Sequence, residues 1–251
     1  MIRREGAVPW ILAIAFLWTA TPGYGFVIDF STEDDGVTPL VNGQSVSSPE
    51  EFGTLFNLSS SGAGNLGLSI YDSTPGFNGS TDDDLQVDLG NLLILQWSGR
   101  PTQTVPGFFD EPNDAKDGGI MIFDFLFPVE MTSVALIDIN GGGQSVFVTL
   151  TDVNGLTRTY DVPGLWTNDI SKLGPDGYDT LDMTTLLPQL GEGGSTATAA
   201  QDAGFDPTMV IRATFDFESS GGLDNFIFTP EPGTFATFFA ATALLCLRRR
   251  R

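Results

Sequence analysis

The stretch SVFVTLTDVNGLTRTY, residues 145–160, decides the fold class. Its first seven residues alternate between two faces, with Val146, Val148 and Leu150 on one and Ser145, Phe147, Thr149 and Thr151 on the other. That period is typical of a β-strand with one buried face. The Asn154-Gly155 pair that follows is a strong signal for a tight turn between antiparallel strands. Residues 145–160 therefore predict a β-hairpin.

Similar short runs, rich in Val, Ile, Phe and Thr, recur between clusters of Gly, Asp, Asn and Pro, which indicates an antiparallel all-β fold. The further strands that we expect cover residues 26–30, 66–71, 92–97, 119–127, 132–139, 209–217 and 223–228. Nearly every position of 120–127 is apolar, so both faces of this strand should be covered, as in the centre of a sandwich.

Outside the two termini, no stretch keeps an apolar face at the helical period for three turns. We therefore expect an all-β, jelly-roll-like antiparallel β-sandwich, with a signal helix at the N-terminus and a transmembrane helix at the C-terminus. Within the domain we expect at most one helical turn, near residues 183–187. The segment 188–207, with GEGGSTATAAQDAG at its centre, is expected to be a loop.

The N-terminus predicts a signal peptide. Arg3 and Arg4 precede an apolar stretch at 8–20, which has the length of a signal-peptide core rather than of a membrane span. Gly23 and Gly25 are small enough to permit cleavage after Gly25. We therefore expect residues 1–25 to be the signal peptide and residues 26–229 to be one acidic β-sandwich domain, long enough for a single sizeable core.

The C-terminal tail, residues 230–251, has three parts: Pro230-Glu231-Pro232, the uncharged run GTFATFFAATALLCL, and the basic cluster Arg248, Arg249, Arg250 and Arg251. As a helix the run would rise about 22 Å, less than the roughly 30 Å of a bilayer core, so it spans only with thinning or with snorkelling arginines. A basic cluster directly after an apolar helix stays on the cytoplasmic side. The domain before Pro230 is then expected across the membrane.

This tail closely resembles the PEP-CTERM sorting signal of exported bacterial proteins. The resemblance implies that the tail halts the exported chain in the inner membrane of a Gram-negative-type bacterium. It also implies that an exosortase-type processing enzyme cuts near Pro230-Glu231-Pro232 and passes the protein on to the cell surface or the extracellular matrix. The alternative is a plain tail anchor.

Charge and composition exclude several classes of function. Of 32 acids and 11 bases in the chain, Glu5 and six arginines lie in the terminal segments, which leaves 31 acids against 5 bases in 26–232 and a net charge near −26. A domain of this charge repels nucleic acid and anionic lipid. The chain has no histidine, and its one cysteine, Cys246, lies in the tail. Disulfides in the domain, Cys/His zinc sites, thiol nucleophiles and imidazole triads are therefore excluded.

Five stretches, at 66–72, 83–85, 90–96, 118–125 and 223–228, resemble the recurrent core of one group of PEP-CTERM exported domains. Those domains are similar to carbohydrate-binding β-sandwiches. The resemblance implies structural calcium and defines no ligand.

Acids crowd two loop-like segments, one around Asp72 and 82–88 and one that contains Glu111, Asp114 and Asp117. Calcium takes six to eight oxygen ligands in irregular geometry, and loops of this kind can supply them. We expect a structural calcium site built from Asp72, Asp82, Asp84 and Asp224. The alternative is that these acids are solvated and keep an exported protein soluble. For Asp224-Asn225, the capping of a turn is an equal alternative.

Aromatic rings in loop-like sequence can stack on sugars, and Trp166 and Tyr178 are the candidates here, with packing in the core as the alternative for both. Trp97 closes the run 92–96 and is expected to pack. We expect a non-enzymatic, exported surface or matrix protein with weak saccharide binding and extracellular polysaccharide as a partner. The alternative is a carbohydrate-active hydrolase that uses paired carboxylates, because this composition leaves that enzyme class open.

Overall fold

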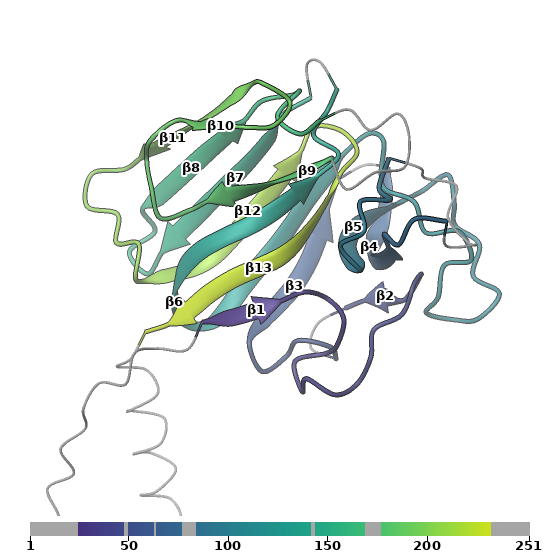
Figure 1. Cartoon of the computed structure of the whole chain (residues 1–251). Coiled ribbons are helices and arrows are strands. Elements are labelled where there is room, and N and C mark those ends of the chain that lie inside the picture. Colours follow the sequence, from purple (N-terminus) through teal and green to yellow (C-terminus); the bar gives the residue numbers. More distant parts are fainter. Residues whose placement is uncertain are drawn as a thin grey trace, which may run out of the picture.

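The computed structural model describes residues 25–47, 50–62, 64–76, 84–141, 144–168 and 177–231, and the fold that they form is all-β (Figure 1). The strands are β1 (Phe26–Ile28), β2 (Ser45–Val46), β3 (Phe56–Ser61), β4 (Asn65–Asp72), β5 (Asn91–Trp97), β6 (Gly119–Ile137), β7 (Val146–Asp152), β8 (Thr157–Val162), β9 (Tyr178–Asp182), β10 (Gln189–Leu190), β11 (Thr196–Gln201), β12 (Val210–Phe217) and β13 (Gly222–Pro230). These described segments contain no helix that is long and apolar enough to cross a membrane. The signal helix and the transmembrane helix expected at the two ends lie outside the described residues.

All strand pairs among the described residues are antiparallel, and β6 joins them into one connected sheet that folds as two layers. Residues 120–124 of β6 lie between β12 and β3, whereas residues 133–137 lie between β13 and β9. The change of partners falls at Pro128, which has no N–H group to donate to a neighbouring strand. One layer therefore continues from β6 through β12, β7, β8 and β11, and the other through β13, β5, β4 and β2.

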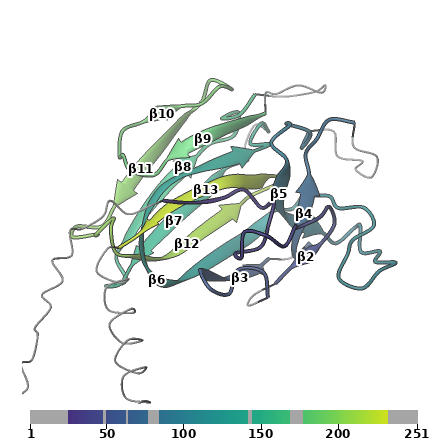
Figure 2. The same ribbon diagram turned by 60° about the horizontal axis from the view of Figure 1, so that its bottom comes forward.

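The ends of these layers lie far apart, with β5, β4 and β2 on one side of the molecule and β10 and β11 on the other (Figure 2). Phenylalanines from the two layers meet between them. The ring of Phe226 on β13 lies 4.5 Å from that of Phe123 on β6 and 5.8 Å from that of Phe215 on β12, measured between centroids. This contact of facing apolar side chains makes the fold sandwich-like.

A second, smaller cluster covers the outer face of β5. Leu93 and Leu95 point into the main core, while Leu92 and Ile94 point the other way, toward Leu85 and the rest of the second cluster. Both faces of β5 are therefore buried, which explains why its sequence is apolar at nearly every position.

The hairpin predicted at 145–160 is confirmed as β7 and β8, with Thr149 opposite Thr159 and Gly155 in the left-handed region at φ 79°. Asp152 stabilises the turn, since its buried Oδ1 accepts hydrogen bonds from the N–H groups of Asn154 and Leu156. A third N–H, from Asp206, donates to Oδ2 at 3.0 Å. Burial opposes ionisation of this carboxyl, but the backbone donors outweigh it and lower the pKa of Asp152.

Three other expectations differ from the structure. The strands expected at 119–127 and 132–139 are one strand, β6. The loop expected at 188–207 is wrong, because it contains β10 and β11, and β11 pairs with β8 at the edge of the sheet. The strands β2, β3 and β9 had no counterpart among the predictions, since their sequences are short or mostly polar.

The two ends of the domain meet. β1 pairs with β13, with Phe26 opposite Phe228, so β1 begins and β13 ends at the same corner of the molecule (Figure 1). The Phe26 and Phe228 rings stack with centroids 5.5 Å apart. The backbone N–H of Glu231 then donates to the carbonyl of Pro128 at 3.2 Å, which fixes the chain to β6 directly after the last strand.

Candidate functional site

The predicted sorting motif begins where the last strand ends. Pro230 is the last residue of β13, opposite Val129, and Glu231 is the last described residue. The third motif residue, Pro232, and the basic cluster Arg248–Arg251 lie outside the described residues. The strand β13 ends at Pro230, one residue after the domain boundary expected at 229.

The predicted calcium ligands do not gather in the part of the chain that is described. Asp72 ends β4, and its Oδ1 accepts the N–H of Thr74 at 2.9 Å, as in a turn. No group of three or more acidic side chains that could hold a metal ion occurs among the described residues, so Asp72, Asp84 and Asp224 do not form one. The fourth residue, Asp82, lies outside the described residues, and the calcium site stays a prediction.

Asp224 is nevertheless unusual, because it is a fully buried carboxyl on β13 opposite Ala135. Its Oδ2 accepts a hydrogen bond from the Asn225 side-chain amide at 3.0 Å, while its Oδ1 has no partner among the described residues. Burial raises the pKa of Asp224 to about 7; the Asn225 backbone N–H lowers it and the nearby Asp29 charge raises it further. Asn225 itself has φ 46°, at an irregular point in the pairing of β13 with β6.

The two aromatic candidates for sugar stacking are placed differently. Trp166 is 1% exposed, and its indole N–H donates to the carbonyl of Gln189 at 3.4 Å. The expectation of stacking on Trp166 is therefore wrong for this structure, because the ring is part of the main core. Tyr178 begins β9 and is half-buried against the second cluster.

Acids also line a hollow of about 260 Å³ beside β1, where Asp29, Glu33, Asp34 and Asp35 lie. Three of them are already bound to neighbouring backbone groups. Asp29 accepts the N–H of Ser31, Asp34 accepts that of Thr54, and Asp35 accepts those of Val37 and Thr38. These acids stabilise turns of the segment between β1 and β3, as the solubility alternative for the surface acids allows.

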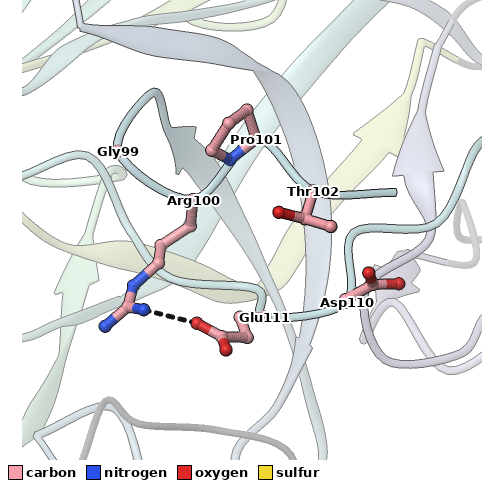
Figure 3. A pocket seen from close by; sticks show the side chains of 6 residues that line it. All are labelled: Gly99, Arg100, Pro101, Thr102, Asp110 and Glu111. Carbon is pink, nitrogen blue, oxygen red and sulfur yellow. Dashed lines mark hydrogen bonds and ion pairs between the residues drawn. The ribbon is translucent and has the colours of Figure 1, made fainter. Parts of the chain in front are cut away.

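A second hollow, of about 210 Å³, lies between the loop after β5 and the loop that leads to β6 (Figure 3). Its lining residues are Gly99, Arg100, Pro101, Thr102, Asp110 and Glu111, and we call it the Arg100 pocket. Nη1 of Arg100 and Oε2 of Glu111 lie 2.5 Å apart in an ion pair. Because the two side chains are 38% and 48% exposed, a ligand can reach this pair from solvent.

The loops of the Arg100 pocket are held by a buried glutamine at its back. Nε2 of Gln96 donates to the backbone carbonyls of Arg100 at 3.1 Å and Glu111 at 3.3 Å. Its Oε1 accepts the hydroxyl of Ser69 and the N–H of Asn113. Since Gln96 is fully buried on β5 and binds the backbone of both loops, it fixes the loops of the pocket to the sheet.

Asp110 is held in a similar way at the mouth of the Arg100 pocket. Its carboxylate accepts the hydroxyl of Thr104 at 2.7 Å and the Thr104 N–H at 3.0 Å. These bonds lower the pKa of Asp110, the side-chain bond most and the backbone bond next. The pocket therefore keeps a carboxylate acceptor beside the Arg100 ion pair at neutral pH.

Trp97 adds an aromatic ring beside the pocket. The Arg100 guanidinium carbon lies 6.0 Å from the centre of the Trp97 ring and the Lys116 Nζ lies 5.5 Å from it, both within reach of a cation–π contact. Four bases are described, and the other two, Arg158 and Arg212, lie on β8 and β12. Two of the four described bases, Arg100 and Lys116, thus lie close to the Trp97 ring in a strongly acidic domain.

The Arg100 pocket was missed from the sequence. Glu111 was grouped with Asp114 and Asp117 as a loop acid, and Trp97 was expected only to pack. The sequence signal for the pocket is the position of Arg100. It is one of only five bases in the domain, and it lies three residues after Trp97.

Comparison with known proteins does not indicate a function for this chain. No protein-family model matches the chain, and no curated protein is significantly similar to it.

Proposed function

We propose that this chain is an exported, non-enzymatic surface or matrix protein, sorted and processed through its PEP-CTERM-like tail. Its β-sandwich, of jelly-roll type, is the part delivered, and weak binding of extracellular polysaccharide is its role there. The tail is a transient membrane anchor until an exosortase-type enzyme releases the domain.

The observation that most supports this proposal is the position of the two domain ends. Phe26, the first residue after the expected signal-peptide cut, pairs with Phe228, two residues before the motif. Both expected processing points therefore flank the core, and every strand that the structure describes lies between Phe26 and Pro230. The two segments expected to contact the membrane also leave the domain at a single corner, so both can reach one bilayer (Figure 1).

The acids of the pocket also favour binding over hydrolysis. A glycosidase needs one carboxyl with a raised pKa to protonate the leaving group. In the Arg100 pocket, Glu111 is paired with Arg100, and hydrogen bonds from Thr104 lower the pKa of Asp110. The carboxyl whose pKa burial raises to about 7, Asp224, is fully buried and lines neither hollow.

The test is mass spectrometry of both ends of the protein recovered from the producing cell. We expect the N-terminus near Phe26 and a C-terminus close to the motif, without the four arginines. Glu231→Ala should abolish the C-terminal cut and leave the domain folded, because Glu231 binds Pro128 through its backbone N–H, which alanine retains.

The matched control is Glu130→Ala. Glu130 is an exposed acid opposite Thr229, so it is close to the motif in space but outside it in sequence. Its removal should leave processing unchanged. Recovery of a folded chain that keeps both Met1 and Arg251 would refute the proposal.

A further inference from the structure

We infer that the Arg100 pocket is a binding site for one neutral sugar residue, recognised through adjacent hydroxyl groups. The inference rests on the proposed function in one respect, since extracellular polysaccharide supplies the ligand. The geometry of the pocket supports the site independently of the sorting tail.

An unused donor is the first reason to expect a ligand. Nε of the Arg100 guanidinium is buried and has no hydrogen-bond partner among the described residues, although Nη1 is paired with Glu111. The terminal nitrogen Nη2 also makes no hydrogen bond among the described residues, because Nη1 alone is paired with Glu111. The exposed end of the guanidinium therefore still has hydrogen-bonding capacity for a ligand (Figure 3).

Donors and acceptors alternate around the pocket, which is the second reason. Arg100 can only donate, Asp110 and Glu111 as carboxylates can only accept, and the Thr102 hydroxyl can do both. Each hydroxyl of a sugar also donates one hydrogen bond and accepts others. Two neighbouring hydroxyls can thus donate a hydrogen bond to a carboxylate and accept one from the guanidinium at the same time.

The charges exclude other ligand classes. An anion in the pocket would face Asp110 and Glu111, and a cation would face Arg100, so either meets a like charge. No group of three acids suitable for a metal occurs within the described segments. A neutral ligand with many hydroxyls meets no such repulsion.

The size of the pocket suits a single sugar ring inside it. A hollow of about 210 Å³ has the volume of about seven water molecules. Its wall is also rigid, because Gln96 holds both loop backbones and Gly99 lies directly against Trp97. A Cβ atom at Gly99 would come within 2.5 Å of the indole, so only glycine lets the loop lie this close to the ring that holds Arg100.

Saturation-transfer NMR on the full chain tests the inference. The chain is purified in a detergent without a sugar headgroup and titrated with D-glucose, D-galactose, D-mannose and D-glucuronate to tens of millimolar. We expect saturable binding of at least one neutral sugar and weaker binding of glucuronate. Arg100→Met and Glu111→Gln should each reduce the affinity roughly ten-fold or more, since each removes a hydrogen bond to a charged group.

Arg212→Met is the matched control. Arg212 and Asp124 form an exposed ion pair whose charged atoms are also 2.5 Å apart, but it lies away from the pocket, so its loss should leave sugar affinity unchanged. Thermal melts check that each variant is folded. The inference is overturned if no neutral sugar binds saturably, if glucuronate binds as tightly as the best neutral sugar, or if folded Arg100→Met keeps its affinity.

If a variant fails to fold, the preference of the unaltered chain for a neutral sugar over glucuronate still tests the inference. If no neutral sugar binds but both chain ends are processed as expected, this inference alone is refuted. Normal sugar binding by a chain that keeps Met1 and Arg251 would refute the proposed sorting and leave the site in place.

Discussion

Replacing Asp224 by asparagine should make the protein more stable at neutral and alkaline pH, and this gain should vanish in acid. Asp224 is fully buried, and one of its carboxyl oxygens lacks a partner among the described residues. Burial, with a smaller contribution from the charge of Asp29, raises the pKa of Asp224 from its ordinary 3.8 to about 7. Asparagine has nearly the same shape and cannot ionise, so Asp224→Asn removes the titration and keeps the packing.

The magnitude follows from the difference between the folded and unfolded pKa values. Between pH 3.8 and about 7 the unfolded chain has an ionised Asp224 and the folded chain a protonated one. The stability contributed by this proton is therefore complete below the unfolded pKa and is lost as the pH rises through the folded pKa. A shift of about three pH units corresponds to about 4 kcal/mol.

Urea unfolding of both proteins from pH 4 to pH 8, with a chelator present, measures this term. Every acid of the domain contributes to each single curve, so the informative quantity is the difference in free energy of unfolding between variant and unaltered chain. It should rise by about 4 kcal/mol in favour of the variant between pH 4 and pH 8.

Asp35→Asn is the matched control. Hydrogen bonds from the N–H and hydroxyl of Thr38, and then from the N–H of Val37, lower the pKa of this exposed carboxyl. Its stabilising effect is present above the unfolded pKa and is lost as the pH falls, so this variant should lose stability at neutral pH. Its difference curve thus runs in the opposite direction.

Parallel stability curves for Asp224→Asn and the unaltered chain would refute the reasoning. The same titration with millimolar calcium in place of the chelator tests the predicted metal site. A cation on Asp224 would stabilise the ionised form, and the unaltered chain would then gain stability relative to the variant as the pH rises. An unchanged melting temperature of the unaltered chain in calcium would contradict that site.

Two further substitutions test the core and the hairpin. Phe226→Ala should reduce the free energy of unfolding by about 3 to 5 kcal/mol, because it removes a ring from the contact between the layers. Urea titrations at pH 7 measure this loss. The control Val27→Ala, at an exposed position, should change the free energy of unfolding by less than about 0.5 kcal/mol. A loss for Phe226→Ala as small as that control would contradict the assigned core. Asp152→Ala should speed amide hydrogen exchange at Asn154, Leu156 and Asp206, whose N–H groups lose their acceptor, and unchanged protection of these amides would show that the turn does not need it.

Local patterns predicted the strands that bury a regular apolar face. The alternation in β7 and the Asn154-Gly155 turn are physical requirements of a hairpin, and the structure has both. The continuous apolar run at 120–127 correctly indicated a strand, but the expectation that both its faces are covered is wrong, because Met121, Phe123 and Phe125 are buried on one face while Leu126 is 51% exposed on the other. The length of β6 was not predicted, because Pro128 and Glu130 interrupt the pattern at the point where the strand changes partners.

The missed strands are defined by their partners rather than by their own residues. The β11 sequence TATAAQ has little apolar content, and it is extended because β8 offers an edge for pairing. The same limit applies to the Arg100 pocket, where residues 96, 100 and 111 meet only after two loops have been fixed to the sheet. Sequence spacing contains no information on such a meeting.

The strand β13, the last that the structure describes, lies in the interior of the sheet, between β6 on one edge and both β1 and β5 on the other. Until residue 230 has been synthesised, three strands lack a neighbour and the aromatic centre stays open to water. Nucleation of folding before the chain is finished is therefore disfavoured. The contacts that complete the sheet, such as that of Phe26 with Phe228, join opposite ends of the domain, and such long-range contacts form slowly. Folding of this domain is consequently a late event in biosynthesis, and a truncated product that stops before β13 should be degraded or aggregate rather than persist as a smaller native form.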